Sequence, residues 1–205
     1  AAGQTLGELR NLAREKAIGA YVAQWDDDDL SHPQRLEVQM AAIHVLQADA
    51  CTLERQLLWW PESRRLAVST ARIWEGSFLC RKDRLPRYPH RPTGEDTPVV
   101  EQVVSRGRVA VLDAPELYTY VYHGANSFAT EHWEEHWQAA AERYENEQYD
   151  IMLQELQSQL QLDLSPWIVR TAAVHPTDAP GSAEDDLPAS PLPSRSFLAV
   201  RPAPP

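Results

Sequence analysis

The sequence predicts an α/β fold, in which helices flank a mixed β-sheet and are followed by a long C-terminal helix and a disordered tail. Three observations support this prediction. An amphipathic stretch at residues 5–19 leads directly into a short apolar stretch at residues 20–25. Further apolar stretches then alternate with helical patterns, and prolines recur every few residues from Ser165 onward. Such alternation is typical of a sheet that is covered by helices.

The first helix is predicted from the spacing of its apolar side chains. These recur at the helical period, and they are Leu6, Leu9, Leu12, Ala13 and Ala17. Gly19 is placed to end the helix. The run AYVAQW at residues 20–25 is short and apolar, which is typical of a parallel strand in the centre of a sheet, buried on both faces.

The middle of the chain is predicted to add a second helix and three strands. Residues 32–49 have a helical pattern, with Pro33 at a favoured position in the first turn. Residues 50–60 and 64–74 flank the turn sequence PES and are predicted to form a β-hairpin. Residues 75–83 are predicted to form a short strand.

A proline-rich loop at residues 85–94 separates these strands from a third helix. That helix is predicted at residues 95–107, because acidic residues open it and Gly107 closes it. β-branched and aromatic residues then predict strands at residues 108–113 and 117–123.

The last predicted helix is long and spans residues 130–162. Its apolar residues follow one face, and they are Trp133, Trp137, Ala140, Tyr144 and the later leucines. We therefore expect a domain at residues 1–128, a helix packed on it at residues 129–164, and a disordered or extended proline-rich tail at residues 165–205.

Composition narrows the class of partner and the compartment. The chain has 205 residues, a net charge of −11 and a pI of about 5.0. Nucleic acids and anionic membranes favour basic surfaces, so neither is an expected partner. Cys51 and Cys80 have neither metal-ligand spacing nor a disulfide framework, which indicates a reducing compartment and predicts a cytoplasmic protein. We expect no signal peptide and no transmembrane segment, because no apolar run approaches the ~20 residues of a membrane span.

Four consecutive aspartates, Asp26 to Asp29, follow the predicted strand at residues 20–25. Two carboxylates about 4 Å apart repel each other by roughly 1 kcal/mol in water and about 4 kcal/mol at a protein surface. The run is therefore either a solvated loop that caps the next helix or a site for a cation. Ligands of α/β sheets bind beyond the C-terminal ends of strands, which favours the cation. Carboxylates in such a place suit Mg²⁺ or Mn²⁺.

The surrounding residues resemble the metal-binding segment of family 2 glycosyltransferases, which have the GT-A fold. The residues that carry the resemblance are Arg10, Asn11, Gly19, Asp26, Asp28, Asp29, Pro33, Arg35 and Leu36. The resemblance implies a partial GT-A domain with a Rossmann-like sheet. It implies that Asp26 and Asp28 form the family's Asp-x-Asp motif. Arg10, Asn11, Asp26 and Asp28 would then bind the donor, and Asp28 would also be the direct metal ligand.

The resemblance extends to the acceptor side. Glu95 and Asp96 match a pair of acidic residues that carries the catalytic base, with Asp96 as the base and Glu95 as its neighbour. Both side chains are also explained by the preference of helix N-termini for acidic residues. Gly76 and Ser77 match the segment that lines the acceptor pocket, although Gly76 is also explained as an ordinary turn glycine.

A histidine near the end of the last strand completes the candidate site. His123 is the best match to a C-terminal histidine that ligates the metal in GT-A enzymes, and imidazole binds ions such as Mn²⁺. The other histidines considered, His32, His132 and His136, are interpreted as solvent-facing or packing residues.

The function that the resemblance implies is metal-dependent transfer of a sugar from a nucleotide-diphosphate sugar to an acceptor hydroxyl, with inversion at the anomeric carbon. The expected partners are that donor and a sugar or glycan acceptor. Two alternatives remain: a non-catalytic glycosyltransferase-like binding module or inactive fragment, and a Mg²⁺-dependent phosphoryl-transfer or hydrolytic enzyme. The second alternative lacks the glycine-rich phosphate loop that such enzymes use.

The chain also departs from the family. The N-terminal strand and the Asp-Asp-Gly-Ser segment that hold the nucleoside are absent from this sequence. At about 30 residues per βαβ unit, roughly 60 residues of the usual domain are missing. We therefore expect this chain alone to bind the donor weakly. We also expect self-association through the uncovered edge of the strand at residues 20–25.

Overall fold

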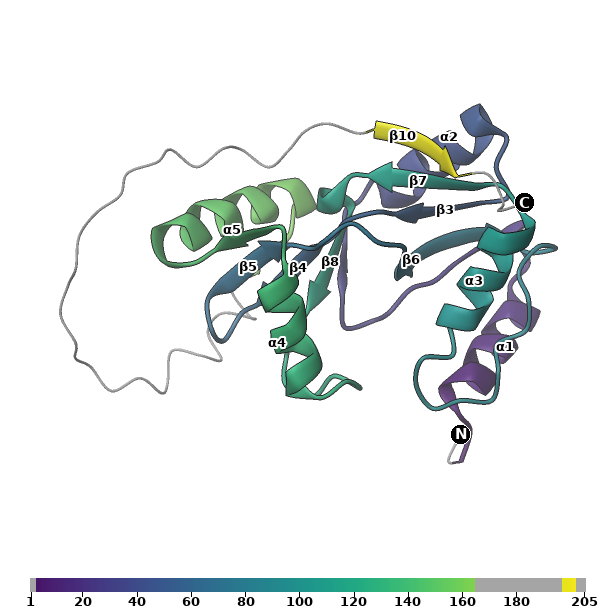
Figure 1. Ribbon diagram of the computed structural model, residues 1–205, viewed down its shortest axis with the longest axis horizontal. Helices are drawn as coiled ribbons and strands as arrows, with labels where there is room; N and C mark the ends of the chain where they lie inside the picture. The colour runs from purple at the N-terminus through teal and green to yellow at the C-terminus, as the bar shows by residue number, and fades with distance from the viewer. Residues whose placement is uncertain (1–2, 165–196, 202–205) are drawn as a thin grey trace.

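The computed structural model describes residues 3–164 and 197–201, and in these residues helices flank two mixed β-sheets (Figure 1). The α/β class that the sequence predicts is confirmed.

The first sheet has five strands in the order β1-β6-β3-β7-β10. They are β1 (Tyr21–Ala23), β6 (Trp74–Arg81), β3 (Ala50–Leu53), β7 (Val109–Asp113) and β10 (Phe197–Arg201). β3 and β7 are parallel, whereas β1 and β3 each pair antiparallel with β6. β1, β3 and β7 therefore point in the same direction, and their C-terminal ends lie at the same end of the sheet.

The second sheet has five strands in the order β2-β8-β4-β5-β9. They are β2 (Leu30–Ser31), β8 (Tyr118–Val121), β4 (Leu57–Trp60), β5 (Arg65–Val68) and β9 (Glu142–Tyr144). The chain runs from β3 into β4, and from β7 through the short 3-10 helix Pro115–Leu117 into β8. β4 and β8 are parallel, as β3 and β7 are in the first sheet. The same two chain segments therefore form a parallel pair in each sheet.

Helices bury the first sheet on both faces. Alternate residues of a strand point to opposite faces, so each strand supplies two sets of core side chains. Cys51, Leu53, Ala110 and Leu112 pack with α2 (Arg35–Leu46). Ala50, Val109 and Val111 pack on the other face with α3 (Thr97–Arg106). Figure 1 shows α2 and α3 on opposite sides of β3 and β7.

The second sheet is covered in the same way by the two C-terminal helices. Leu57, Trp59, Leu66 and Val68 face α5 (Asn146–Leu160). Leu58, Trp60 and Ala67 face α4 (Thr130–Ala139). The Trp60 ring meets the rings of Trp133 and Trp137 edge to face, at centroid distances of 5.9 and 5.4 Å.

The prediction of one long helix at residues 130–162 is wrong. α4 ends at Ala139, β9 follows, and α5 begins at Asn146. The physical reason is that the apolar residues of this region cover both faces of the second sheet, which one straight helix cannot reach. The break is held by the Ala141 amide, which donates to the Val68 carbonyl at 2.9 Å.

The strand predicted at residues 20–25 exists as β1, and among the described strands one of its edges is uncovered, as expected for this chain. Its predicted parallel pairing is wrong, because β1 pairs antiparallel with β6. Among the described strands β1 pairs with β6 alone, and all three of its residues are half-buried. Its side chains do pack on both faces, because Tyr21 and Ala23 lie on the α2 side and Val22 on the α3 side. Burial on two faces made the strand apolar, and this pattern carries no information about neighbours within the sheet.

The predicted hairpin is correct only in part. β4 and β5 form it, with Leu57 opposite Val68. Residues 50–53 belong instead to β3 in the first sheet, and residue 74 begins β6, which is a long strand rather than a short one. The helix predicted at residues 32–49, the helix predicted at residues 95–107 and the strands predicted at residues 108–113 and 117–123 are confirmed by α2, α3, β7 and β8.

The first helix is confirmed as α1 (Leu6–Lys16), but its predicted apolar core face is wrong. Gly7 and Asn11 are buried, whereas the exposed fractions of Leu9 and Leu12 are 40% and 45%. α1 packs through backbone and polar contacts on the proline-rich loop. A Cβ on Gly7 would lie 1.9 Å from the Pro89 carbonyl oxygen, so only glycine allows this approach.

The predicted disordered tail at residues 165–205 lies outside the described residues, except for residues 197–201. These five form β10, which pairs antiparallel with β7, with Phe197 opposite Asp113. The tail was expected to be disordered or extended, and in these five residues it is extended.

Candidate functional site

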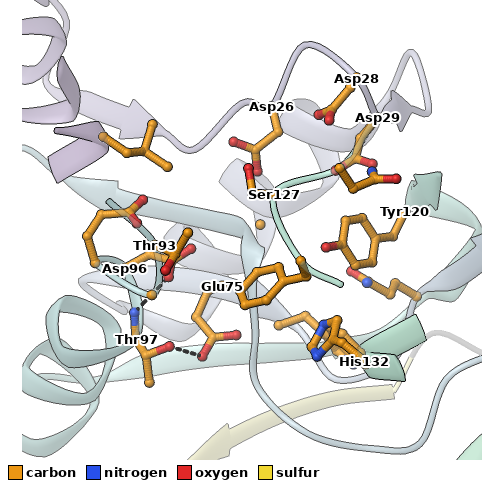
Figure 2. Close-up of a pocket in the computed structure, with 18 of the residues that line it drawn as sticks. Asp26, Asp28, Asp29, Glu75, Thr93, Asp96, Thr97, Tyr120, Ser127 and His132 are labelled. Carbon is orange, nitrogen blue, oxygen red and sulfur yellow. Dashed lines mark hydrogen bonds between the residues drawn. The ribbon is translucent and has the colours of Figure 1, made fainter. Parts of the chain in front are cut away.

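One cavity brings together most of the candidate residues. It has a volume of about 210 Å³ and lies where β1 ends and β6 begins. The candidate residues that line it are Arg10, Asp26, Asp28, Gly76, Glu95 and Asp96. Figure 2 shows three sides of it: the aspartates after β1, Asp96 at the start of α3 with Glu75 of β6 beside it, and Tyr120 with His132 opposite.

The aspartates in the cavity have different partners. Asp29 accepts hydrogen bonds from the Tyr118 hydroxyl and, at 2.9 Å, from the Val121 amide, which tie the loop to β8. Burial raises the pKa of the Asp29 carboxyl to about 7, against the effect of these two hydrogen bonds. Asp29 is therefore an anchor of the loop, and it leaves Asp26 and Asp28 to face the cavity.

Arg10 joins the two acidic parts of the site. Its Nη2 donates to Asp26 Oδ1 at 2.9 Å and its Nε donates to Glu95 Oε1 at 2.6 Å. Burial alone would lower the Arg10 pKa, but the charge of Asp26 and the hydrogen bonds to Glu95 and Asp26 outweigh it and raise the pKa above its usual value. Glu95 is 1% exposed and is fully engaged by this contact. The site therefore keeps a permanent cation between its two groups of carboxylates.

Asp96 sits at the first turn of α3 and is held from two directions. Its Oδ1 accepts from the Thr97 amide at 2.9 Å, and its Oδ2 accepts from Gln24 Nε2 at 2.8 Å. The Thr97 hydroxyl in turn bonds Glu75 Oε1 at 3.0 Å (Figure 2). Each carboxylate oxygen has a second lone pair, so Asp96 is fixed in place and can still accept a proton from a ligand.

The glycine of the predicted acceptor segment has a steric role. A Cβ on Gly76 would lie 2.9 Å from the Tyr118 hydroxyl oxygen and 3.6 Å from Asp26 Oδ2. Any larger residue would displace the tyrosine that holds Asp29. The lack of a side chain at Gly76 therefore lets β6 and the aspartate loop approach each other.

Three candidate residues do not line the cavity: Asn11, Ser77 and the predicted metal ligand His123. Ser77 is fully buried, and its hydroxyl bonds the Leu53 amide at 2.9 Å and the Trp74 carbonyl at 2.7 Å. Asn11 is 5% exposed, and its amide pairs with both the carbonyl and the amide of Tyr88 at 2.8 and 2.9 Å. The structure gives the side chains of Ser77 and Asn11 a part in holding the fold, and brings neither into the site.

The predicted metal ligands are neighbours. His123 Nε2 lies 3.1 Å from Asp28 Oδ2, although His123 is 95 residues away in the chain. Among residues 3–164 and 197–201 no group of three or more His, Cys, Asp or Glu side chains is arranged to hold a metal ion. The predicted ligands that meet are one carboxylate, Asp28, and one imidazole, His123. A cation such as Mg²⁺, which usually takes one or two carboxylates from a protein, would need water and substrate phosphates to complete its shell here.

Sequence reasoning missed the other wall of the cavity. The additional lining residues on that side are Gln56, Arg72, Trp74, Tyr120, Phe128, His132 and His136. His132 packs on Phe128 and His136 on Trp74, in line with their interpretation as packing residues, and both also line the cavity. Their four-residue spacing on a helix, which puts Nε2 of one ring 3.0 Å from Nε2 of the other, was the signal available in the sequence.

Comparison with models of known protein families and with curated proteins finds no match to this chain. The arrangement of side chains in the cavity is therefore the basis for assigning a function.

Proposed function

We propose that this chain is a metal-dependent glycosyltransferase, which moves a sugar from a nucleotide-diphosphate donor to an acceptor hydroxyl. The observation that supports this most is the placement of two acidic groups on one cavity. Asp26 and Asp28 come from the loop after β1, Asp96 comes from the start of α3, and Arg10 bonds to Asp26 and to Glu95 beside Asp96.

The two acidic groups suit different halves of the reaction. Asp28 and His123 are the residues that would hold Mg²⁺ or Mn²⁺, with the donor diphosphate completing the coordination. Such an ion, when bound, neutralises the charge that develops on a departing diphosphate. Arg10 and Asp26 lie between this end and Asp96, in a position to contact the sugar or the diphosphate.

Asp96 is the group proposed to accept the proton of the acceptor. A sugar hydroxyl is a poor nucleophile until a positioned base takes its proton. As the acceptor oxygen forms a bond to the anomeric carbon, the bond from that carbon to the diphosphate oxygen breaks, and its electron pair leaves with the diphosphate. The proton moves to the Asp96 carboxylate. A single displacement of this kind inverts the anomeric carbon.

Metal binding provides the first test. We expect Mn²⁺ to bind the wild-type protein and to bind Asp28→Asn at least about 10-fold more weakly, because a neutral amide replaces one of two ligands. The measurement is calorimetric titration together with paramagnetic broadening of loop resonances. Asp27→Asn is the matched control, since Asp27 is exposed in the same loop and does not line the cavity. Equal affinities for the wild type and Asp28→Asn would contradict the assignment.

Transfer provides the second test. UDP-, GDP- and dTDP-linked sugars are incubated with Mn²⁺ and a mixture of simple glycosides, and nucleotide release is followed. We expect Asp96→Asn to bind the donor normally but to turn over about 10²–10⁴-fold more slowly. The matched control is Glu101→Gln, which changes an exposed carboxylate on the same helix. Donor binding without turnover in the wild type would instead favour the non-catalytic binding module.

A further inference from the structure

We propose that one wall of the cavity, formed by β8, the loop after it, α4, the start of β6 and Gln56 just before β4, binds the acceptor, and that this acceptor is an uncharged sugar ring. This inference rests on the proposed function only in identifying the bound sugar as the acceptor of the transfer. The binding of a sugar to this wall does not depend on it. The wall is defined by Gln56, Trp74, Tyr120, Phe128, His132 and His136, all of which line the cavity.

Phe128 gives this wall an open aromatic surface. One face of its ring stacks on His132, with centroids 4.4 Å apart and planes inclined by 22°. The side chain nevertheless remains 42% exposed, so a ligand can pack against the rest of the ring. Large aromatic rings supply most of the contact energy of small-molecule pockets, and a sugar offers such a ring its apolar C–H groups.

Gln56 gives the same wall an unmet hydrogen-bond acceptor. It is 2% exposed and lines the cavity, and its Oε1 has no hydrogen-bond partner in the described part of the chain. A buried acceptor without a partner costs about 1–3 kcal/mol. A hydroxyl donated by a ligand in the cavity would recover this energy, and sugar rings present several hydroxyls.

The charges around the wall disfavour an anionic ligand. Arg72 is its nearest cation, but Arg72 already bonds Glu75 at 2.7 Å and stacks on Trp74 at 4.1 Å. Burial lowers the pKa of both His132 and His136, so the imidazoles are neutral near pH 7. Asp96 and Glu75 stand on the facing side of the cavity (Figure 2). A carboxylate or phosphate on the ligand would meet repulsion here, and Arg72, the cation beside this wall in the described part of the chain, is already paired with Glu75.

The position of the wall fits the proposed reaction. Figure 2 places Tyr120 and His132 across the cavity from Asp96, with Glu75 between them. A ring held against Phe128 and Gln56 would therefore turn its other edge toward Asp96, where its hydroxyl is to lose a proton.

The test measures binding of sugars without donor or metal, so that it does not depend on transfer. Methyl glucoside and methyl galactoside are the neutral probes, and methyl glucuronide carries a carboxylate on the same ring. Saturation-transfer NMR and titration of chemical shifts give the dissociation constants. We expect a neutral glycoside to bind at least several-fold more tightly than the glucuronide.

Phe128→Ala should weaken the neutral glycoside by about 2-fold to 10-fold, as expected for one aromatic contact. Gln56→Leu should weaken it about 10-fold, and thermal unfolding checks that this buried variant is folded. Ile151→Ala, which shortens an exposed apolar side chain on α5 outside the cavity, should change nothing.

Three results would overturn the inference: no binding of any neutral glycoside, equal or tighter binding of the glucuronide, or unchanged affinity in Phe128→Ala. Sugar binding that depends on Phe128, combined with no transfer in any donor assay, would overturn the proposed function and leave the sugar site intact. Transfer that does not depend on Phe128 would support the proposed function and overturn the proposed sugar site.

Discussion

At the scale of single residues, the aspartate loop depends on a buried charge. Arg35 is fully buried, and its hydrogen-bond partners are all neutral. Its Nη2 bonds the carbonyls of Gln24 and Gly76 at 2.8 and 3.3 Å, on the two strands that border the cavity. Its guanidinium also lies over the rings of Trp25 and Tyr118, at 5.0 and 4.9 Å. Arg35 therefore positions the loop without touching the cavity.

We predict that Arg35→Met destabilises the protein by about 3 kcal/mol or more, because two buried carbonyls lose their donor while the removed charge is replaced by an apolar chain. Urea unfolding measures the change. Arg106→Met, at an exposed position on α3, should stay within about 0.5 kcal/mol of the wild type. Equal stability of Arg35→Met and the wild type would mean that the loop is held by its other contacts.

A second prediction at this scale concerns pH. Burial, together with the charges of His132 and Arg72, lowers the pKa of His136 from 6.5 to about 4. Between these values the unfolded chain binds a proton that the folded chain does not, so stability should fall as the pH decreases from about 6.5 to about 4. Allowing for the partial exposure of His136, the loss attributable to it is on the order of 1–2 kcal/mol.

Unfolding free energies at several pH values in this range measure that loss. His136→Gln should remove the corresponding part of the acid sensitivity. His44→Gln, which changes an exposed histidine on α2, should retain it. A wild-type protein whose stability does not change between these pH values would contradict the prediction.

The sequence located one side of the candidate site better than the other. Asp26, Asp28 and Asp96 were selected because they match acidic positions of the family that the sequence resembles, and the structure places all three on one cavity. His132 and His136 were missed, since histidines in a tryptophan-rich helix also suit the core and Trp133 indeed packs there. Ser77 was predicted to line the acceptor pocket, but its hydroxyl turns into the core and bonds the Leu53 amide. The sequence alone does not show which way the side chain after Gly76 points.

At the scale of elements, a five-residue strand far along the chain closes the edge of the first sheet. β10 pairs with β7 along its whole length, from Asp113 back to Val109. The prolines around it had suggested a disordered segment. Local composition gave no sign of this strand, because its stability comes from a partner about 85 residues earlier in the chain rather than from its own residues.

We predict that a chain ending at residue 164 is less stable than one ending at residue 201, by on the order of 2 kcal/mol, since the outer backbone groups of β7 lose their partners. Hydrogen exchange should show faster exchange at the amides of Val109 to Asp113 that bond to β10, and unchanged exchange in β4 and β5. Identical protection of β7 in the two chains would show that β10 contributes nothing measurable.

Elements were predictable where the local residues gave a clear signal. α3 was predicted from the acidic residues at its start and from Gly107 at its end, and β7 from its β-branched residues, and the structure confirms both. The prediction of an apolar packing face on α1 failed for a physical reason. The helix packs by a close backbone approach at Gly7 and by hydrogen bonds of the Asn11 amide, which leave its leucines exposed. Hydrophobic periodicity cannot detect a helix that packs through its polar side.

At the scale of the whole molecule, one region combines an unpaired strand edge with exposed apolar side chains. Among the described strands β1 has a single neighbour, and Ile18, just before it, is fully exposed. Leu9 and Leu12 on α1 are also exposed. Edges and patches of this kind favour association.

We therefore predict that this chain forms dimers or larger species as its concentration rises, measured by light scattering after size exclusion. Ile18→Lys combined with Leu12→Lys should return it to a monomer, because charges beside an edge strand oppose pairing. Ile151→Lys, an equally exposed apolar position on α5, should leave association unchanged. A monomer at every concentration would contradict the prediction. In the described part of the chain no helix is long and apolar enough to cross a membrane.

The two parallel strand pairs set the order in which the chain can fold during its synthesis. β4 and β5 form a hairpin as soon as both have left the ribosome, because they are neighbours in the chain. The parallel partners of β3 and β4 are made much later, since β7 ends at Asp113 and β8 at Val121. Until Val121 has been made, β4 lacks β8 and the apolar faces that these strands share stay open to other chains. After that point both parallel pairs can form, and β9 and β10 are added as the rest of the chain appears. We expect a nascent chain halted before Val121 to remain bound to chaperones, while one halted well beyond it is released.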